Sequence, residues 1–459
     1  RVLLNGRRDL RELLTVTIDG VDTRDIDDAV SLEIKDGKYV LGVHIADVSH
    51  YVKYRGCIDK EAYERGTSVY FPDRVLPMLP QALSNGACSL NEGENRYAMT
   101  CFMTFDKSGK RQSYEIYESV IRSDKRMTYD EVTAILRGEK SDRDYPAIAP
   151  MLREMETLTH LLESRRKERG EVELDIKEAH IYLNERGEIV IPEYDRTISH
   201  RLIEQFMVSA NEAVAEFLEK QKAPCLYRVH ESPAPEKAAM LYSFVRDLGI
   251  KTYGDSESAT PDDFRKILKQ VEGKPYASVV NTVMLRSMQK ARYCEDNLGH
   301  FGLASECYCH FTSPIRRYPD LFVHRVLKKV LHDEKTEARE TFAPIAKAAG
   351  IDTSERERTA DLAERDVDDL YKLAYMQDRI GEEYEAIISG VIESGFFAQL
   401  PNTIEGMIRL ESLPQDSYAY YPEKFLLKGK RNSFKIGDSV KVKVASCDFG
   451  TRRIQFVLA

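Results

Sequence analysis

Five aspartates are crowded into ten residues near the start of the sequence, at positions 19, 22, 25, 27 and 28. Two like charges about 4 Å apart repel by about 4 kcal/mol at an effective dielectric constant of about 20. A solvated loop lets such side chains separate, whereas a loop held between buried elements must protonate one carboxylate or bind a cation. Oxygen ligands without His or Cys favour Mg²⁺ or Mn²⁺. The run therefore predicts a divalent-metal site, with an Asp-rich surface turn as the alternative.

The aspartate run lies between two stretches whose residues are typical of buried strands. Residues 13–18 and 29–34 are apolar and rich in β-branched side chains, so each predicts a strand. Residues 39–52 alternate between apolar and polar side chains and predict a strand that pairs with the second of these. Residues 97–105 and 112–122 predict a hairpin. The aspartates are therefore expected on a loop that is fixed at both ends.

Helical patterns dominate the middle of the sequence. Apolar side chains or helix end signals favour helices at residues 130–136, 145–169, 198–222, 235–248, 261–271, 276–288, 321–332 and 353–376. Gly170 is placed to end the second helix, and Ser354 with Glu357 has the capping-box spacing that predicts the start of the last. Residues 179–192 predict another hairpin. Strands followed by helices predict an α+β protein whose first domain, residues 1–380, is mixed α/β.

The composition changes near Gly381, after which strands predominate. The stretches rich in β-formers and punctuated by glycines are residues 384–400, 404–408 and 439–457, a pattern typical of a small β-barrel. From Arg409 to Ala459, ten Lys or Arg stand against five Asp or Glu, and tyrosines are interleaved with them. Such a surface suits stacking on the bases of a single-stranded nucleic acid. We therefore predict a second, all-β domain over residues 381–459.

The spacing Asp-x5-Asp-x-Asp-Asp, together with the segment from Ser313 to Asp320, resembles the signatures of the RNB family of processive 3′→5′ exoribonucleases. The resemblance implies that Asp19, Asp25 and Asp28 hold two divalent ions, Mg²⁺ or Mn²⁺. It also implies that Asp27 is the residue most needed for the chemical step. Two metals can clamp the attacking water and the leaving 3′ oxygen of an in-line phosphodiester displacement. No role is implied for Asp22, which is expected at the surface.

The same resemblance implies contacts with RNA near the scissile phosphate. Arg316 would hold a phosphate bidentately, which a planar guanidinium can do, and Arg317 would assist it. The alternative for both is a basic helix start that faces solvent. Tyr70 would stack on the terminal nucleotides, with a core tyrosine as the alternative. Glu364 would act near the scissile end of the RNA, whereas helical spacing alone makes it a residue of a solvated face.

Two further features concern which nucleic acid is the substrate: RNA or DNA, and structured or unstructured RNA. Glu204 resembles the acid that reads the ribose 2′-hydroxyl, a contact that distinguishes RNA from DNA. Family members often carry two acids at this point, whereas this chain has Gln205 second, so the reading residue stays open. Residues 65–72 resemble the branch of the family whose members degrade structured RNA.

The C-terminal barrel resembles an S1 RNA-binding domain of the OB class, through residues 390–397 and 405–408. The resemblance implies that Phe396 or Phe397 stacks on bases and that basic side chains meet phosphates. These basic side chains are Lys441, Lys443, Arg452 and Arg453. An OB barrel could bind protein instead, and its aromatic residues could belong to the core. Next to a nuclease domain, RNA is the favoured ligand.

Composition narrows the class of protein. The chain has 459 residues, 42% hydrophobic and 31% charged, with no apolar stretch long enough to span a membrane and no signal peptide. Its eight cysteines form no C-x-x-C pair, which favours reduced thiols in a cytoplasm. A net charge of −9 argues against non-specific coating of nucleic acid. The sequence has no Walker-type phosphate loop, so use of a nucleoside triphosphate is not indicated.

The sequence therefore predicts a cytoplasmic, monomeric hydrolase that shortens the 3′ end of single-stranded RNA, releasing one nucleoside 5′-monophosphate at a time. A catalytically silent RNA-binding regulator on the same fold is the alternative, and the intact set of aspartates speaks against it. Because the sequence begins with Arg1 and not Met, we expect a fragment or processed form. The cold-shock domains that usually precede this type of domain are expected to be missing from it.

Overall fold

The computed structural model describes residues 2–140, 144–174, 179–193, 196–274 and 276–459. Its first part is built on a seven-stranded sheet with the strand order β1-β8-β7-β4-β3-β2-β9. The edge pairs β1–β8 and β2–β9 are parallel, and the inner neighbours are antiparallel. The strands of this sheet are β1 (Arg8–Leu10), β2 (Val16–Asp19), β3 (Asp28–Lys35), β4 (Lys38–Ala46), β7 (Asn95–Phe105), β8 (Arg111–Arg122) and β9 (Lys125–Thr128).

The two faces of this sheet differ in chemistry. On one face, Val30, Val43 and Cys101 belong to a large apolar core that also contains residues of three helices. These helices are α3 (Tyr129–Leu136), α4 (Ile148–Arg169) and α5 (Ile198–Lys220). On the other face, His44 is bonded to Ser31 and Thr100, and small residues such as Ala46 join a separate cluster. Because successive side chains of a strand point to opposite faces of the sheet, the apolar side chains of each strand face the helices.

The predicted hairpin over residues 97–122 is confirmed by β7 and β8, and Gly170 ends α4 in a left-handed conformation with φ of 109°. The strand predicted over residues 39–52 stops at Ala46, because Asp47 caps the short helix α1 (Val48–Tyr51) by accepting the N–H of His50. A second short helix, α2 (Cys57–Arg65), and the strands β5 (Val69–Tyr70) and β6 (Val75–Leu76) follow. Helix α1 packs against α9 (Tyr318–Leu331), and Thr67 and Ser68, just before β5, pair with the segment that leads into α9.

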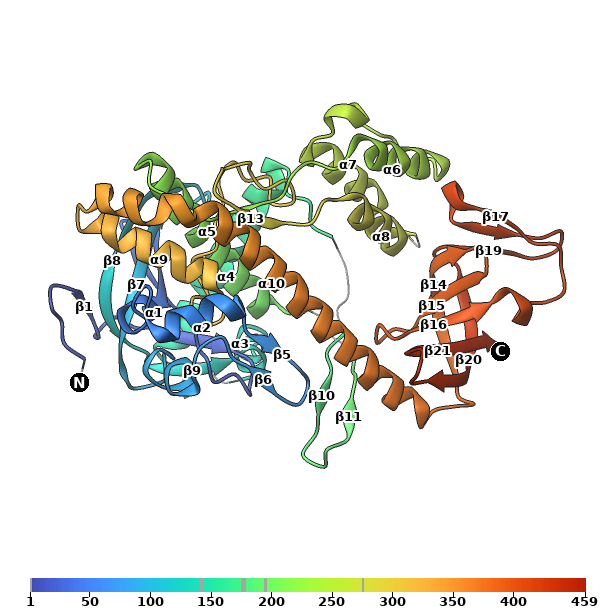
Figure 1. The fold of residues 1–459 in the computed structure, drawn as a ribbon, viewed down its shortest axis with the longest axis horizontal. Coiled ribbons are helices and arrows are strands. Elements are labelled where there is room, and N and C mark those ends of the chain that lie inside the picture. Colours follow the sequence, from blue (N-terminus) through green and yellow to red (C-terminus); the bar gives the residue numbers. More distant parts are fainter. Residues whose placement is uncertain (1, 141–143, 175–178, 194–195, 275) are drawn as a thin grey trace.

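The longest helix, α10 (Lys335–Gln377), crosses the molecule from the seven-stranded sheet to the C-terminal barrel (Figure 1). The sequence predicted only its second half, with Ser354 as the N-cap. That prediction of the helix start is wrong, because the helix already runs through Pro344 and Gly350. The hydroxyl of Ser354 donates to the carbonyl of Gly350 inside the helix and accepts the N–H of Tyr293.

The C-terminal strands form a closed barrel with the order β14-β15-β16-β21-β20. A small sheet of β17, β18 and β19 is inserted between β16 and β20. The strands are β14 (Glu383–Ile392), β15 (Gly395–Gln399), β16 (Glu405–Arg409), β17 (Ala419–Tyr421), β18 (Leu426–Lys428), β19 (Ser433–Lys435), β20 (Ser439–Asp448) and β21 (Arg453–Leu458). The predicted α+β class, with an all-β barrel after a mixed domain, is confirmed.

Three helices lie between the sheet and the barrel at the top of Figure 1. They are α6 (Pro235–Asp247), α7 (Pro261–Val271) and α8 (Ala277–Ser287). They share one apolar core with the barrel and the end of α10, to which Phe264, Phe456 and Met376 belong. The remaining strands are β10 (Tyr182–Leu183) with β11 (Ile189–Val190), the predicted hairpin, and β12 (Tyr227–Val229) with β13 (Arg292–Cys294). None of the helices in the described ranges is both long and apolar enough to cross a bilayer.

Candidate active site

The aspartate loop, residues 19–28, is held at both ends by the seven-stranded sheet. Asp19 is the last residue of β2 and pairs with Thr128, and Asp28 is the first residue of β3 and pairs with Ile45. Between them, Ile26 is only 1% exposed and anchors the loop in an apolar cluster. The prediction of a loop fixed between two strands is confirmed, and Asp22 is exposed as expected.

Two residues from elsewhere in the chain fix the backbone of the loop. The hydroxyl of Ser89 donates to the carbonyl of Arg24 (2.8 Å) and accepts the N–H of Ile26 (3.1 Å). The guanidinium of Arg126, on β9, donates to the carbonyls of Val21 (2.9 Å) and Thr23 (2.5 Å). The loop conformation is therefore set by the flanking strands β2 and β3, by Ser89 and by Arg126.

Burial makes the negative charge of this loop costly. It raises the pKa of Asp19, Asp27 and Asp28 above the usual range of a carboxyl. The neighbouring charge of Asp28 raises the pKa of Asp19 further, and the positive charge of Arg316 partly opposes the shift at all three. Among the described residues, the Oδ2 atoms of Asp19 and Asp27 have no hydrogen-bond partner. Buried carboxylate oxygens without a donor are suited to a cation.

The side chains do not form a ready-made ligand set as they lie. Within the described ranges, no three His, Cys, Asp or Glu side chains are close enough together to hold a metal ion. Asp25 is turned toward Tyr70, whose hydroxyl donates to it, and Asp27 accepts the N–H of Ile315 (2.8 Å). Only one oxygen of Asp25 accepts the tyrosine hydroxyl, so the other could still meet a cation, and the ligand set of Asp19, Asp25 and Asp28 stays a prediction.

Arg316 faces the aspartate loop from the segment that leads into α9. Its Nε lies 3.6 Å from an oxygen of Asp27, and its Nη2 donates to the hydroxyl of Ser313 (3.0 Å). Its carbonyl accepts the N–H of Ser68 (2.9 Å), which ties residues 66–70 alongside. Gly66 has φ of 70°, and a Cβ there would lie 2.6 Å from the side chain of Arg356 on α10, so this close approach requires glycine.

Tyr70 and Glu364 meet beside the aspartate loop. The backbone N–H of Tyr70 donates to the carboxylate of Glu364 (2.7 Å), and its hydroxyl donates to Asp25 (2.7 Å). Tyr70 is 37% exposed, which excludes the alternative of a core tyrosine. The carboxylate of Glu364 faces β5 and is half-buried, and this burial raises its pKa. The structure thus gathers Asp25, Asp27, Arg316, Tyr70 and Glu364, which are far apart in the sequence.

Glu204 lies in the second turn of α5. Its helix begins beside Tyr129, which follows the partner of Asp19 on β9 and stacks on His200, one turn before Glu204. Glu204 forms an ion pair with Arg196. Gln205 is buried and turned into the core, so Glu204 is the more accessible of the two candidates for a ribose contact.

The prediction for Arg317 is corrected. Its guanidinium points inward and pairs with Asp320 (2.8 Å), the buried aspartate that also accepts the N–H of Ser313. The charge of Arg317 is therefore used to fix the start of α9, and Arg316 alone of this pair faces the aspartates.

The barrel residues lie at the other end of the molecule from the aspartate loop (Figure 1). Phe396 is 0% exposed and stacks on Phe434, so the predicted stacking of Phe396 on RNA is wrong. Phe397, its alternative, is half-buried. Lys441 and Lys443 are exposed on β20, and Lys441 is paired with Glu383 (2.6 Å).

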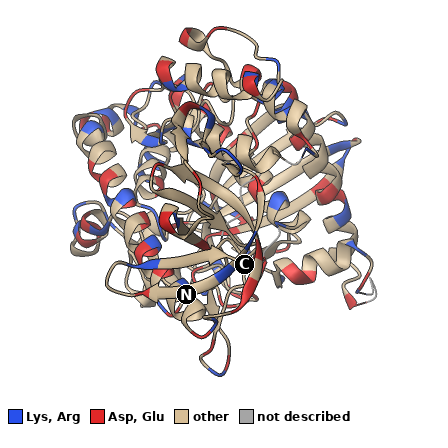
Figure 2. Ribbon diagram, turned by 90° about the vertical axis from the view of Figure 1, so that its right-hand side faces the viewer, with Lys and Arg blue, Asp and Glu red and all other residues tan. Residues whose placement is uncertain are grey.

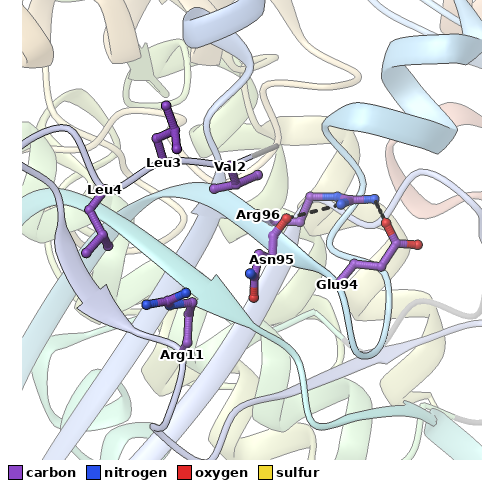
Figure 3. A pocket seen from close by; sticks show the side chains of 7 residues that line it. All are labelled: Val2, Leu3, Leu4, Arg11, Glu94, Asn95 and Arg96. Atoms are coloured by element: carbon purple, nitrogen blue, oxygen red, sulfur yellow. Dashed lines mark hydrogen bonds and ion pairs between the residues drawn. The ribbon is translucent and has the colours of Figure 1, made fainter.

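A pocket of about 720 Å³ lies between the N-terminal segment and the start of β7 (Figure 3). It is lined by Val2, Leu3, Leu4, Arg11, Glu94, Asn95 and Arg96. An ion pair between Glu94 and Arg96 closes one wall. None of the predicted site residues lines it.

Sequence reasoning missed Arg126 and Ser89. Neither belongs to a motif, and their contacts are to backbone carbonyls and an N–H more than 60 positions away. Only the parallel pairing of β9 with β2 brings Arg126 to the loop. No pattern in the sequence signals that pairing.

Comparison with known proteins agrees with this geometry. The profile of the RNB domain matches residues 7–333, and that of the S1 RNA binding domain matches residues 377–458. Ribonuclease R of Aquifex aeolicus is 46% identical over 461 residues, which cover 99% of this chain and 65% of that protein. Ribonuclease R 1 of Lactococcus lactis is 44% identical over 458 residues, which cover 98% of this chain and 56% of that protein.

A solved structure is also similar. Mycoplasma genitalium RNase R in complex with ribose methylated single-stranded RNA matches with a TM-score of 0.91 and 31% identity, over 99% of this chain and 72% of that chain. The chain spans 56 to 65% of the length of the two curated relatives above. The resemblance expected from the aspartate spacing is thus confirmed: the chain belongs to the RNB family and carries an S1 RNA binding domain at its C-terminal end.

Proposed function

We propose that the chain is a processive 3′→5′ exoribonuclease that hydrolyses single-stranded RNA to nucleoside 5′-monophosphates. In this proposal, residues 1–380 form the catalytic domain and residues 381–459 bind RNA. The observation that carries it is the buried aspartate loop, in which Asp19 Oδ2 and Asp27 Oδ2 accept no hydrogen bond from the described residues and Asp27 lies 3.6 Å from Arg316. Membership of the RNB family supports the same reaction.

Asp19, Asp25 and Asp28 would hold two divalent ions, Mg²⁺ or Mn²⁺. Such ions would offset the crowded negative charge and stabilise the charge that develops on the reacting phosphodiester. The raised pKa of Asp19 and of Asp28 and the free Oδ2 of Asp19 support this assignment.

The other residues would bind and orient the RNA. Arg316 would hold the phosphate next to Asp27, because a guanidinium offers two parallel N–H donors to phosphate oxygens. The partly exposed ring of Tyr70 would stack on a terminal base, with Glu364 fixing its backbone. Glu204 would accept a hydrogen bond from a ribose 2′-hydroxyl, which selects RNA over DNA.

The solved relatives support RNA as the substrate class. Mycoplasma genitalium RNase R has been solved with ribose methylated single-stranded RNA and with double-stranded RNA. We therefore extend the proposal to RNA that contains duplex segments, as residues 65–72 suggested.

Asp27→Asn tests the proposal. The variant should stop cleavage while RNA affinity stays nearly unchanged, because the change removes interactions made in the transition state. The measurement is hydrolysis of 5′-labelled RNA in Mg²⁺, with binding of the same RNA by filter retention. The deoxy oligomer serves as the substrate control.

Two outcomes would contradict the assignment. If the unchanged chain leaves the labelled RNA intact in Mg²⁺, the chain is an RNA-binding regulator on a nuclease fold. If Asp27→Asn loses binding and cleavage together, Asp27 holds the RNA and does not serve the chemical step.

A further inference from the structure

The small sheet inserted in the barrel has two different faces. In its antiparallel register, Tyr420, Leu427 and Phe434 lie opposite one another on one face. Leu427 is 1% exposed, Phe434 stacks on Phe396, and the hydroxyl of Tyr420 donates to the carbonyl of Val391 (3.2 Å). This face anchors the sheet on the barrel.

The opposite face carries the alternate residues and points outward. Tyr421, at the end of β17, is 39% exposed, and Lys428 is exposed at the end of β18. Lys435 lies opposite Leu426 in the same row as Tyr421. Two segments adjoin this surface: the turn between β18 and β19 and the helical turn Pro422–Lys424. Together we call them the basic sheet face, which comprises Tyr421, Lys424, Lys428, Lys430, Arg431 and Lys435.

The five cations of the basic sheet face outnumber the acids beside them, which are Asp416, Glu423 and Asp438. No Asp or Glu occurs between Lys424 and Lys435 in the sequence. None of its five cationic side chains forms an ion pair with any residue in the described part of the chain. Basic side chains elsewhere on the barrel differ, since Lys441 pairs with Glu383 and Arg452 with Asp366 (2.7 Å). Figure 2, which faces the end with the C-terminus, shows basic and acidic residues intermixed over most of the ribbon.

The turn between β18 and β19 is rigidly held. The carboxylate of Asp416 accepts the backbone N–H groups of Lys430 (2.9 Å), Arg431 (2.8 Å) and Asn432 (3.0 Å). These backbone bonds lower the pKa of Asp416. The acceptor atoms of Asp416 are thus used by the backbone, which presents the side chains of Lys430 and Arg431 to solvent on a fixed turn.

We propose that the basic sheet face binds single-stranded RNA and is the main contact of the C-terminal domain with its substrate. This inference rests on the proposed function and places the contact away from the buried Phe396. Fixed cations meet phosphates, and an exposed aromatic ring stacks on bases, the two features of sequence-independent single-strand binding. Phosphates provide the negative charge that five unpaired cations require, and the ring of Tyr421 favours RNA over an acidic protein.

The test replaces the charges at the turn with Lys428→Gln, Lys430→Gln and Arg431→Gln in one variant. Binding of a labelled, unstructured RNA to the Asp27→Asn form of the full chain is measured over a series of salt concentrations. We expect the affinity at low salt to fall about tenfold or more, and the salt slope to become shallower by about 2, because each lost phosphate contact on a single strand contributes about 0.7. Tyr421→Ala should weaken binding without changing the salt slope.

The control on the barrel is Lys441→Gln with Lys443→Gln on β20, the phosphate contacts that the family resemblance implied. Because Lys441 is already paired with Glu383, this variant should lower the affinity and flatten the salt slope less than the triple variant does. Thermal unfolding of all variants checks that the barrel is intact. Unchanged affinity and slope in the triple variant, or a larger effect of the β20 control, would overturn the inference and leave a protein partner as the occupant of this face. Cleavage of a short RNA by the triple variant reports separately on the catalytic site.

Discussion

Single side chains decide whether the aspartate loop can carry its charge. Asp27 is 4% exposed, and among the described residues its carboxylate accepts a hydrogen bond only from the N–H of Ile315, so its charge depends on Arg316. Arg126 acts on the other side, through the backbone of the loop. Its guanidinium donates to backbone carbonyls of the loop, and its backbone N–H donates to the carboxylate of Glu92 (2.8 Å). Arg316 therefore offsets the charge of Asp27, whereas Arg126 sets the geometry of the loop and its positive charge also opposes the rise in the pKa of Asp19.

Arg126→Ala should lower activity without weakening the binding of RNA. Loss of the bonds to the carbonyls of Val21 and Thr23 frees the turn that leads to Asp25, so that the carboxylates are no longer held for cations. Residues that orient metal ligands from behind typically contribute about 10- to 100-fold to metal affinity or activity. We expect a fall of that size in kcat, with KM for RNA nearly unchanged, and weaker binding of Mn²⁺ by calorimetry.

The control for this prediction is Arg122→Ala at the end of β8, which lies near the opposite edge of the sheet and where the arginine makes a loose, exposed ion pair with Glu12. It should leave kcat and Mn²⁺ binding unchanged. If kcat falls equally in both variants, Arg126 does not position the loop. The same conclusion follows if a high concentration of RNA restores the activity of Arg126→Ala.

At the scale of elements, α10 joins distant parts of the fold. It carries Glu364 to β5 and packs against β13 through Gly350, where a Cβ would lie 3.1 Å from the carbonyl oxygen of Tyr293. Ser354, one turn later, accepts the N–H of Tyr293. The sequence spacing of Ser354 and Glu357 matches a capping box, but the tertiary contact with β13 explains the serine.

Ser354→Ala should destabilise the protein by about 1–3 kcal/mol, because it leaves the buried N–H of Tyr293 without an acceptor. Thr359→Ala is the matched control, since Thr359 makes the same type of bond to a carbonyl four residues earlier but is exposed. Urea unfolding measures both free energies. If the free energy of unfolding falls no more in Ser354→Ala than in Thr359→Ala, the hydrogen bond from Tyr293 of β13 to Ser354 does not stabilise the protein.

At the scale of the whole molecule, the sequence predicted those structural features that depend on residues close together along the chain. The hairpin of β7 and β8, the end of α4 at Gly170 and the fixed aspartate loop follow from local patterns and are confirmed. The inward turn of Arg317 toward Asp320 and the burial of Phe396 depend on how separate elements pack. Strand order alone brings Arg126 to the loop, and no local pattern encodes it.

Buried histidines should make the whole fold less stable in acid. His44 is on β4, the central strand of the sheet, and its ring nitrogens lie 2.9 Å from the hydroxyls of Ser31 on β3 and Thr100 on β7. Burial lowers its pKa to about 3. The unfolded chain therefore binds a proton below about pH 6.5 that the folded chain refuses, so stability falls as the pH drops from there toward the folded pKa.

We expect this effect in the difference between the free energies of unfolding of the wild-type protein and of His44→Gln. The contributions of all other titrating groups are the same in both proteins and cancel in this difference. Gln keeps a donor and an acceptor but does not titrate. The stability of the wild type relative to the variant should fall by about 1.4 kcal/mol for each pH unit between about 6 and 4. Urea unfolding across this range measures it. A constant difference would mean that the imidazole of His44 is protonated in the folded protein or that the unfolded chain does not take up the proton.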